Sequence, residues 1–209
     1  MRNRDARTIL VMAYLKLNRI CVTSSGNDSL DEIIQGCHQK NKKYQEILYK
    51  RFFGYALKVA LIYNRDRDNA LEIVNDSFIK VFNQINKYNS SFPFRTWLGK
   101  IVVNTSIDRF RKNNRNLKAE DEVILVPDDK PGIITQLTAQ DILKLLNLLP
   151  DIQRMVFNLF EIEGYSHEEI SSILKIPENT SRVYLTRAKK RLRELFQLYF
   201  NISYEKVGN

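Results

Sequence analysis

Residues 166–193, SHEEISSILKIPENTSRVYLTRAKKRLR, constrain the fold of this chain more than any other stretch. Ser166 stands three positions before Glu169, which is the spacing of a capping box at the start of a helix. Pro177 ends that helix, and a second helix rich in arginine and lysine follows. This layout predicts a helix-turn-helix, whose second helix can enter the major groove of DNA. The alternative is a generic amphipathic hairpin with a solvated basic face, but cap, proline, periodicity and charge agree on the DNA-binding motif.

The positive charge of the chain is concentrated in two stretches. The net charge is +9 over 209 residues. Residues 95–118 hold seven basic side chains against the single acid Asp108, and residues 175–193 hold seven against Glu178. An acidic patch at 120–129 separates the two stretches. Two basic surfaces on one chain predict two contacts with nucleic acid.

Composition excludes several other classes of protein. With 44% hydrophobic residues, 7 glycines and 5 prolines, the chain is expected to be globular and helical. Cys21 and Cys37 make no disulfide framework, which favours a reducing, cytoplasmic location. They form no zinc-ligand spacing with His38 or His167, so we expect no metal and no cofactor. No apolar run is long enough to cross a bilayer, and we expect no membrane insertion.

Apolar residues recur at helical spacing on both sides of a proline-containing stretch, which predicts an all-α fold. We expect two helical domains, 28–114 and 137–199, the second containing the helix-turn-helix. An acidic flexible linker, 115–136, joins them, because Pro127, Pro131 and Gly132 oppose a helix there. Residues 1–27 are expected to be an N-terminal extension and 200–209 a tail. Residues 123–126 are the one place where a strand is conceivable.

Three stretches in this order resemble the extracytoplasmic-function sigma factors, a two-domain class of bacterial transcription initiation factors. Residues 66–82, DRDNALEIVNDSFIKVF, are similar to the family's acidic helix that grips core RNA polymerase. Residues 93–112, PFRTWLGKIVVNTSIDRFRK, are close to its PFRTWL helix, which opens the minus-ten element. Residues 148–193 resemble its domain that reads the minus-thirty-five element. The resemblance spans about residues 30–196.

The resemblance implies a sigma factor that is not an enzyme and has no small-molecule substrate. Its partners would be core RNA polymerase, promoter DNA in duplex and single-stranded form, and an anti-sigma protein. The residues implied for polymerase binding are Glu72, Asn75 and Asp76, although spacing alone favours a solvated helix face. Those implied for minus-ten DNA are Asn89, Ser90, Ser91, Arg95, Trp97, Lys100, Asn104, Asp108, Arg109 and Arg111. Those implied for minus-thirty-five DNA are Thr180, Arg182, Val183, Thr186, Arg187, Lys190 and Arg191.

Individual side chains carry more specific expectations. In the second helix of the motif, arginine can contact guanine and Val183 or Thr186 a thymine methyl group, while lysines 189 and 190 and Arg191 are expected to meet phosphates. For Trp97, core packing and stacking on DNA both remain open, whereas Phe92 and Phe94 are expected to pack.

The chain departs from the family pattern at two places in the motif. Asn179-Thr180-Ser181 replaces a common Gly-Thr-Val, and Ser181 should weaken an apolar contact there. Tyr184 replaces a usual basic residue. We expect either change to alter promoter preference.

Two other functions compete with this interpretation. A helix-turn-helix regulator that works without polymerase would explain the C-terminal domain but leave residues 66–112 unexplained. A nucleic-acid enzyme is disfavoured because two histidines and no clustered acidic or cysteine ligands leave no visible catalytic set.

Overall fold

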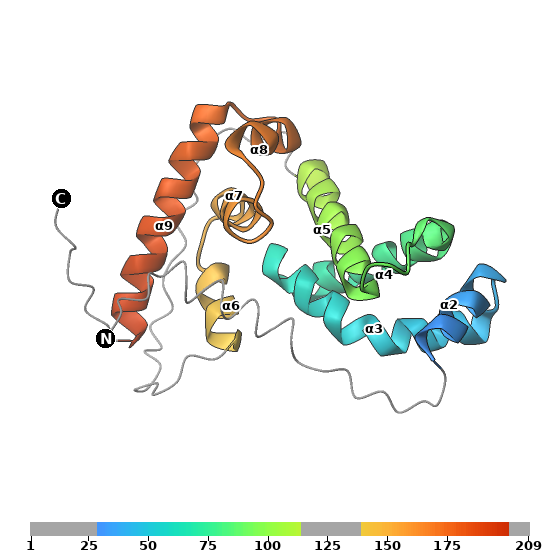
Figure 1. Ribbon diagram of the computed structural model, residues 1–209. Helices are drawn as coiled ribbons and strands as arrows, with labels where there is room; N and C mark the ends of the chain where they lie inside the picture. The colour runs from blue at the N-terminus through green and yellow to red at the C-terminus, as the bar shows by residue number, and fades with distance from the viewer. Residues whose placement is uncertain (1–28, 114–138, 201–209) are drawn as a thin grey trace. The chain divides into compact units, whose positions relative to one another are not determined.

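The computed structural model describes residues 29–113 and 139–200. The chain divides into two compact units, and the described part of each is a helical bundle (Figure 1). The described ranges contain eight α-helices, one 3-10 helix and no strand. The predicted all-α fold is therefore confirmed. The predicted extension, the linker, residues 201–209 of the tail and the conceivable strand at 123–126 lie outside the described residues.

The N-terminal domain contains α2 (Leu30–His38), α3 (Lys42–Tyr63), α4 (Arg67–Gln84), the 3-10 helix η1 (Ile85–Lys87) and α5 (Phe94–Asn113). Local caps set the helix starts. Ser29 forms a capping box with Glu32 before α2. Asp66 begins α4, because its carboxylate accepts the backbone N–H groups of Asp68 and Asn69 at 3.1 and 3.3 Å.

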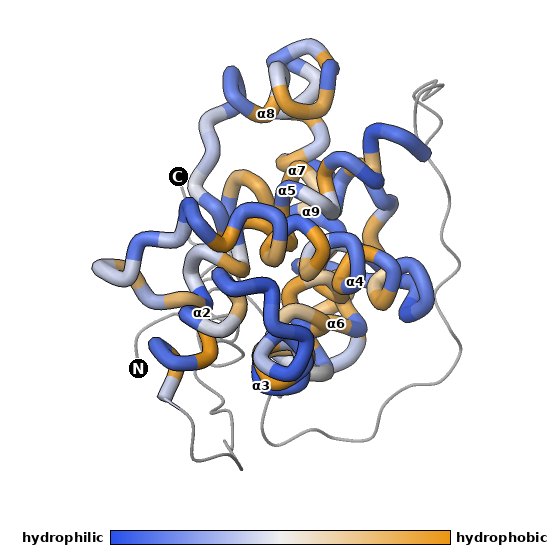
Figure 2. The backbone as a smooth tube through the Cα atoms, turned by 90° about the vertical axis from the view of Figure 1, so that its right-hand side faces the viewer, coloured by the Kyte–Doolittle hydropathy of each residue, from blue (hydrophilic) through white to orange (hydrophobic). Residues whose placement is uncertain are grey.

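Helices α3, α4 and α5 pack on one another and enclose the core of this domain. Phe78 of α4 and Leu98 of α5 are almost fully buried in it. Polar and apolar residues alternate along these helices in Figure 2, as expected when each helix buries one face. A Cβ atom at Gly99 would lie 2.7 Å from the Tyr55 hydroxyl, so the glycine lets α5 approach α3 closely.

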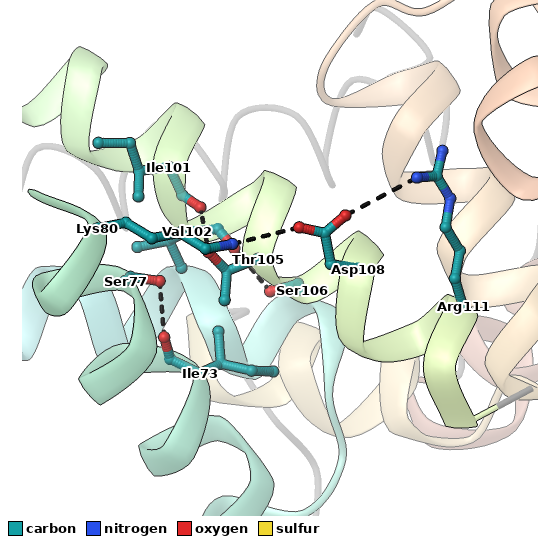
Figure 3. A network of polar contacts seen from close by, with 9 residues as sticks. All are labelled: Ile73, Ser77, Lys80, Ile101, Val102, Thr105, Ser106, Asp108 and Arg111. Carbon is teal, nitrogen blue, oxygen red and sulfur yellow. Dashed lines mark hydrogen bonds and ion pairs between the residues drawn. The ribbon is translucent and has the colours of Figure 1, made fainter. Parts of the chain in front are cut away.

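Three hydroxyl groups are buried at the α4–α5 packing and are hydrogen-bonded within their own helices. Ser77, Thr105 and Ser106 each donate to the carbonyl four residues earlier, at 2.6, 2.8 and 2.9 Å (Figure 3). Because their donors are satisfied, these side chains can occupy the core without the cost of an unpaired polar group.

The C-terminal domain contains α6 (Ala139–Asn147), α7 (Asp151–Glu161), α8 (His167–Leu174) and α9 (Glu178–Phe200). The predicted helix-turn-helix is confirmed in α8 and α9. Ser166 caps α8 with the expected capping box to Glu169. Lys175, at φ 56° and ψ 44°, ends α8 in the left-handed conformation. Helix α9 packs mainly on α7, and Leu185, Ala188 and Leu192 are among its buried residues at helical spacing.

Two charged side chains are buried on α7, where an amphipathic pattern places polar residues outside. Arg154 is 2% exposed, donates to the Asn147 Oδ1 at 2.8 Å, and lies 3.4 Å from an Asp151 carboxylate oxygen. The side chain of Glu161 is 1% exposed and pairs with Lys189 of α9 at 2.6 Å. These contacts tie α6 to α7 and α7 to α9.

Candidate polymerase-binding and nucleic-acid surfaces

The three residues predicted to contact polymerase lie on α4. Glu72, Asn75 and Asp76 are all exposed, at positions i, i+3 and i+4 on one helix face. The Asn75 Oδ1 accepts a hydrogen bond from the Tyr49 hydroxyl at 3.0 Å, which fixes its side chain. Ile79, one turn further along this face, is 59% exposed. Ile79 was not among the residues predicted for this face.

Ion pairs connect the polar face of α4 to α5. The Glu72 carboxylate pairs with the guanidinium of Arg109. Lys80 lies 3.2 Å from the Asp108 carboxylate and donates to the Thr105 hydroxyl at 3.1 Å (Figure 3). Two residues predicted to bind minus-ten DNA, Asp108 and Arg109, are thus also engaged in bracing α5 against α4. Exposed pairs of this kind contribute about 0–1 kcal/mol, so a stronger ligand can displace them.

The remaining predicted residues of α5 divide by exposure. Lys100 and Asn104 are exposed. Arg95 is half-buried, with its guanidinium 5.4 Å from the centre of the Tyr55 ring. Arg111 lies near the end of the helix, 3.8 Å from the Asp108 carboxylate (Figure 3). The structure therefore places the cations of α5 along much of its length.

Residues 89–92 form a hydrogen-bonded turn before α5. The Asn89 Oδ1 accepts the backbone N–H of Ser91 at 2.9 Å, and the Asn89 carbonyl accepts that of Phe92 at 3.1 Å. The Tyr88 hydroxyl donates to the Phe92 carbonyl at 2.7 Å. Asn89, Ser90 and Ser91 are all exposed, as a role in contacting DNA requires.

An aromatic cluster lies beside this turn. Trp97 is half-buried, with its ring 5.4 Å from that of Tyr88 and 5.6 Å from that of Phe94. The packing role left open for Trp97 is therefore present in the structure. Phe94 is buried, as expected, at 2% exposure. The packing expected for Phe92 is wrong, because its side chain is 63% exposed.

The predicted DNA-reading residues of α9 lie on its outer side. Arg182, Val183, Thr186 and Arg187 are exposed. A carboxylate oxygen of Glu178, one turn earlier, lies 2.5 Å from the Arg182 guanidinium. The Thr186 hydroxyl donates to the carbonyl of Arg182 at 2.9 Å. Val183 is 46% exposed on this helix.

The other three residues predicted to bind minus-thirty-five DNA differ in their exposure. Thr180 is half-buried and Lys190 is exposed. Arg191 is half-buried, 3.6 Å from the Glu194 carboxylate. Lys190 is thus the most accessible phosphate-binding candidate of the three.

Two of the residues that depart from the family motif, Ser181 and Tyr184, are buried. Ser181 is 0% exposed, and its hydroxyl lies 2.9 Å from the His167 Nδ1. The apolar contact expected to weaken is thus replaced by a polar contact between α9 and the start of α8. Tyr184 is 8% exposed. Its side chain therefore packs inside the domain and not on the exposed side of α9.

His167 lies in a mixed aromatic and cationic environment. Its ring stacks on Phe160 with centroids 4.6 Å apart. Partial burial, with the nearby Arg182 charge, lowers the pKa of His167 below its usual range. The neutral ring is therefore favoured at neutral pH.

Lys189, which was expected to meet a phosphate, is engaged in contacts within the domain. Its ammonium group pairs with the buried Glu161 carboxylate at 2.6 Å and lies 5.6 Å from the centre of the Phe160 ring. This lysine holds α9 against α7, whereas its neighbour Lys190 is exposed.

Other kinds of site receive no support from the described residues. In those ranges, no group of three His, Cys, Asp or Glu side chains could hold a metal ion. No helix within them is long and apolar enough to span a membrane. Cys37 is buried, and burial raises the pKa of its thiol to about 11. Cys21 lies outside the described residues.

Comparison with known families accounts for both domains. Residues 48–116 match Sigma-70 region 2, and residues 139–192 match Sigma-70, region 4. Together these matches cover more than half of the chain and fall in order on its two helical domains, which defines a sigma factor of the sigma-70 family. Within that family, the chain belongs to the extracytoplasmic-function (ECF) RNA polymerase sigma factors.

Individual relatives are distant but extend over both regions. The chain is 29% identical over 182 residues to the ECF RNA polymerase sigma-E factor of Haemophilus influenzae, covering 79% of this chain and 94% of the relative. It is 24% identical over 152 residues to the ECF RNA polymerase sigma factor SigM of Bacillus subtilis, covering 71% and 93%. A solved structure of the sigma factor RpoE of Bartonella quintana with the anti-sigma factor NepR is 25% identical, covering 68% of this chain and 91% of that chain. The TM-score of that comparison is 0.42.

Proposed function

We propose that this chain binds core RNA polymerase and directs initiation at promoters that carry both a minus-thirty-five and a minus-ten element. The observation that carries the proposal is the ordered pair of Sigma-70 regions, each on its own helical domain. We infer that the chain acts in the cytoplasm, where transcription takes place, and performs no catalysis of its own.

The polymerase contact is proposed on the exposed face of α4. Asp76 and Glu72 supply negative charge there, and Ile79 supplies an apolar side chain with 59% exposure. Protein interfaces commonly combine an apolar centre with charged groups that set orientation. Asp76 is the cleanest residue for a test, since Glu72 also pairs with Arg109 inside the domain.

The minus-ten contact is proposed on the turn at 89–91 and along α5. Strand separation needs polar groups that receive an extruded base and cations that follow the displaced backbone. The exposed turn residues supply the first, and Lys100, Arg95 and Arg111 supply the second. Arg109 joins them when DNA displaces its pairing with Glu72.

The minus-thirty-five contact is proposed on the outer side of α9. Arg187 and Arg182 can each bond guanine in the major groove, while Val183 and Thr186 can pack on thymine methyl groups. Lys190, with Thr180 and Arg191, would bind phosphates and add affinity that falls with salt. Arg182 must exchange its contact with Glu178 for one with DNA.

An anti-sigma protein is the further partner that the family implies. We propose that it acts by covering one or both of the surfaces on α4 and α9. Its identity and the signal that releases it would come from affinity purification of the chain from its own cells.

Run-off transcription tests the proposed function. The purified chain would be mixed with its cognate core RNA polymerase on a library of randomised promoters, and transcripts would be sequenced. We expect the chain to select promoters that share two spaced elements. Binding to duplex DNA with no effect on core polymerase would instead support the competing function, a helix-turn-helix regulator.

A further inference from the structure

His167 connects the two helices of the helix-turn-helix to the helix that precedes them. It is the first residue of α8, directly after the capping residue Ser166. Its ring stacks on Phe160 of α7, with the ring planes 26° apart. Its Nδ1 lies 2.9 Å from the hydroxyl of Ser181 in α9. Because the three helices also pack on one another, His167 lies where their relative positions are set.

The Ser181 hydroxyl differs from four other hydroxyl groups in the helices. A carbonyl four residues earlier in the same helix accepts the hydroxyl of Ser77, Thr105, Ser106 and Thr186. Ser181 instead contacts a side chain of another helix, and it is 0% exposed. A hydrogen bond is directional, so this contact restrains both the distance and the orientation of the first turn of α9.

Ser181 directly precedes residues that are proposed to read DNA. Arg182 and Val183 follow it in α9, and both are exposed. Arginine recognises guanine by geometry, since two of its donors must meet the guanine O6 and N7 together. Such a group must be held within about 0.5 Å of its productive position by the residues behind it. A loss of the contact at Ser181 should therefore affect the choice between DNA sequences.

The charges around the His167 ring oppose a further positive charge. The charged residues beside the ring, in space or in sequence, are Arg182, Lys189 and Glu178 of α9, Glu161 of α7, and Glu168 and Glu169 of α8. Lys189 already engages Glu161 at 2.6 Å, and the capping box already engages Glu169. Partial burial and the Arg182 charge lower the pKa of His167, so the ring takes up a proton in mildly acidic solution.

We propose that His167 is a positioning residue for minus-thirty-five recognition, which holds the first turn of α9 while its ring is neutral and releases it when the ring is protonated. This inference rests on the proposed function and adds a proton-dependent contact behind its minus-thirty-five surface. The charged ring is repelled by Arg182, the residue next to Ser181, so the ring and the first turn of α9 move apart. Discrimination between promoters is then weaker in mildly acidic solution.

The test measures the preference of the full chain for a minus-thirty-five duplex selected by run-off transcription over a scrambled duplex of equal length. Fluorescence anisotropy gives both affinities. Their ratio removes the general attraction of cations to phosphates, which acts on both duplexes. At pH 7.5, Ser181→Ala should lower the ratio roughly 2- to 13-fold, the equivalent of one hydrogen bond. From pH 7.5 to pH 5.5 the ratio should fall at least about 2-fold for the unaltered chain and stay constant for Ser181→Ala.

Two substitutions of His167 separate its hydrogen bond from its stacking. His167→Asn keeps a hydrogen-bonding group near the place of Nδ1 and does not titrate, so it should restore most of the ratio at pH 7.5 and keep it constant to pH 5.5. His167→Phe keeps a ring against Phe160 without the nitrogen, and should match Ser181→Ala. His38→Asn is the matched control, because it removes the other of the two histidines, on α2 of the N-terminal domain, and should keep the full pH dependence.

All affinities are measured well below the Tm of each variant, so that unfolding does not contribute. A ratio that Ser181→Ala leaves unchanged overturns the positioning role, even where Tm falls, because the contact then serves stability alone. A pH dependence that persists in His167→Asn also overturns it, as does a ratio in His167→Phe equal to that of the unaltered chain.

The outcomes also distinguish this inference from the proposed function. A chain that initiates transcription and prefers the selected duplex equally with and without the Ser181 hydroxyl leaves the proposed function standing and removes the positioning role alone. If the unaltered chain initiates at no promoter in the run-off assay, the proposed function fails and the positioning role fails with it.

Discussion

Lys189 pairs with the buried Glu161, whereas its neighbour Lys190 is exposed. We therefore expect opposite effects on stability and DNA binding when each lysine is replaced. The Glu161 side chain is 1% exposed and that of Lys189 is 38% exposed. Removing one partner of a buried pair costs about 3–5 kcal/mol. Because water reaches Lys189, we expect Lys189→Ala to lower the free energy of unfolding of the C-terminal domain by the smaller amount of about 2–3 kcal/mol. For a domain of this size that is a fall in Tm of roughly 10–20 °C.

The assay takes advantage of the single tryptophan of the chain, Trp97, which lies in the N-terminal domain. Thermal unfolding would be followed by circular dichroism, which reports both domains, and by tryptophan fluorescence, which reports one. Lys189→Ala should shift part of the circular dichroism transition and leave the fluorescence transition unchanged. Adding Glu161→Gln should recover most of the loss, since it removes the stranded buried charge.

Lys190→Ala is the matched control for Lys189→Ala. Lys190 is exposed, so its removal should leave Tm unchanged. It should reduce the slope of the logarithm of the upstream DNA-binding constant against the logarithm of the salt concentration by about 0.9, the effect of one lost phosphate contact. Lys189→Ala, assayed well below its Tm, should keep the slope. An unchanged Tm together with a reduced slope for Lys189→Ala would refute the assignment of this lysine to the domain core.

Three further predictions concern the proposed surfaces and the turn motif. Arg187→Ala should weaken binding to minus-thirty-five DNA by about 1–3 kcal/mol in a fluorescence anisotropy titration and relax preference at one base pair; unchanged affinity would show that Arg187 faces away from the bases. Asp76→Ala should weaken core polymerase binding in a pull-down without changing Tm, and equal binding would exclude this face of α4. The folded-state pKa of His167 is lowered by burial and by Arg182, so the unfolded chain takes up the proton first. The resulting stability is full above the ordinary histidine pKa near 6.5 and is lost as pH falls below it. Tm of the C-terminal domain should therefore fall from pH 7 to pH 5, and less steeply in His167→Asn.

Local signals in the sequence accounted for much of the fold. The capping box of Ser166 with Glu169 depends on residues three positions apart, so it was predicted from the sequence alone. The caps at Ser29 and Asp66 are equally local. Leu185 and Leu192 recur at helical spacing in α9 and are buried, as apolar periodicity predicts. The boundaries of the linker fall outside the described residues and stay predictions.

Contacts between distant residues were not predictable from spacing. Arg109 pairs with Glu72 and Lys189 with Glu161, and neither partner is marked by a nearby motif. Arg154 was also missed, because a polar residue in an amphipathic helix is assigned to the outside, whereas its hydrogen bond to Asn147 allows burial.

Phe92 illustrates the same limit at the proposed minus-ten surface. Its sequence neighbourhood is equally compatible with packing, and only the register of α5 decides that Phe94 is buried while Phe92 is exposed. The polar replacement at Ser181 is similar, because its partner His167 lies fourteen positions away on another helix.

The most direct test of the account is permanganate footprinting of a selected promoter. Permanganate oxidises unpaired thymines, so it reports strand opening, and nuclease protection of the same DNA reports upstream binding. With core polymerase and the chain together, we predict reactive thymines in the minus-ten element and protection of the minus-thirty-five element, and with either protein alone no reactive thymines. Upstream protection by the chain with no opening in the presence of core polymerase would contradict the claim that it is a promoter-opening sigma factor.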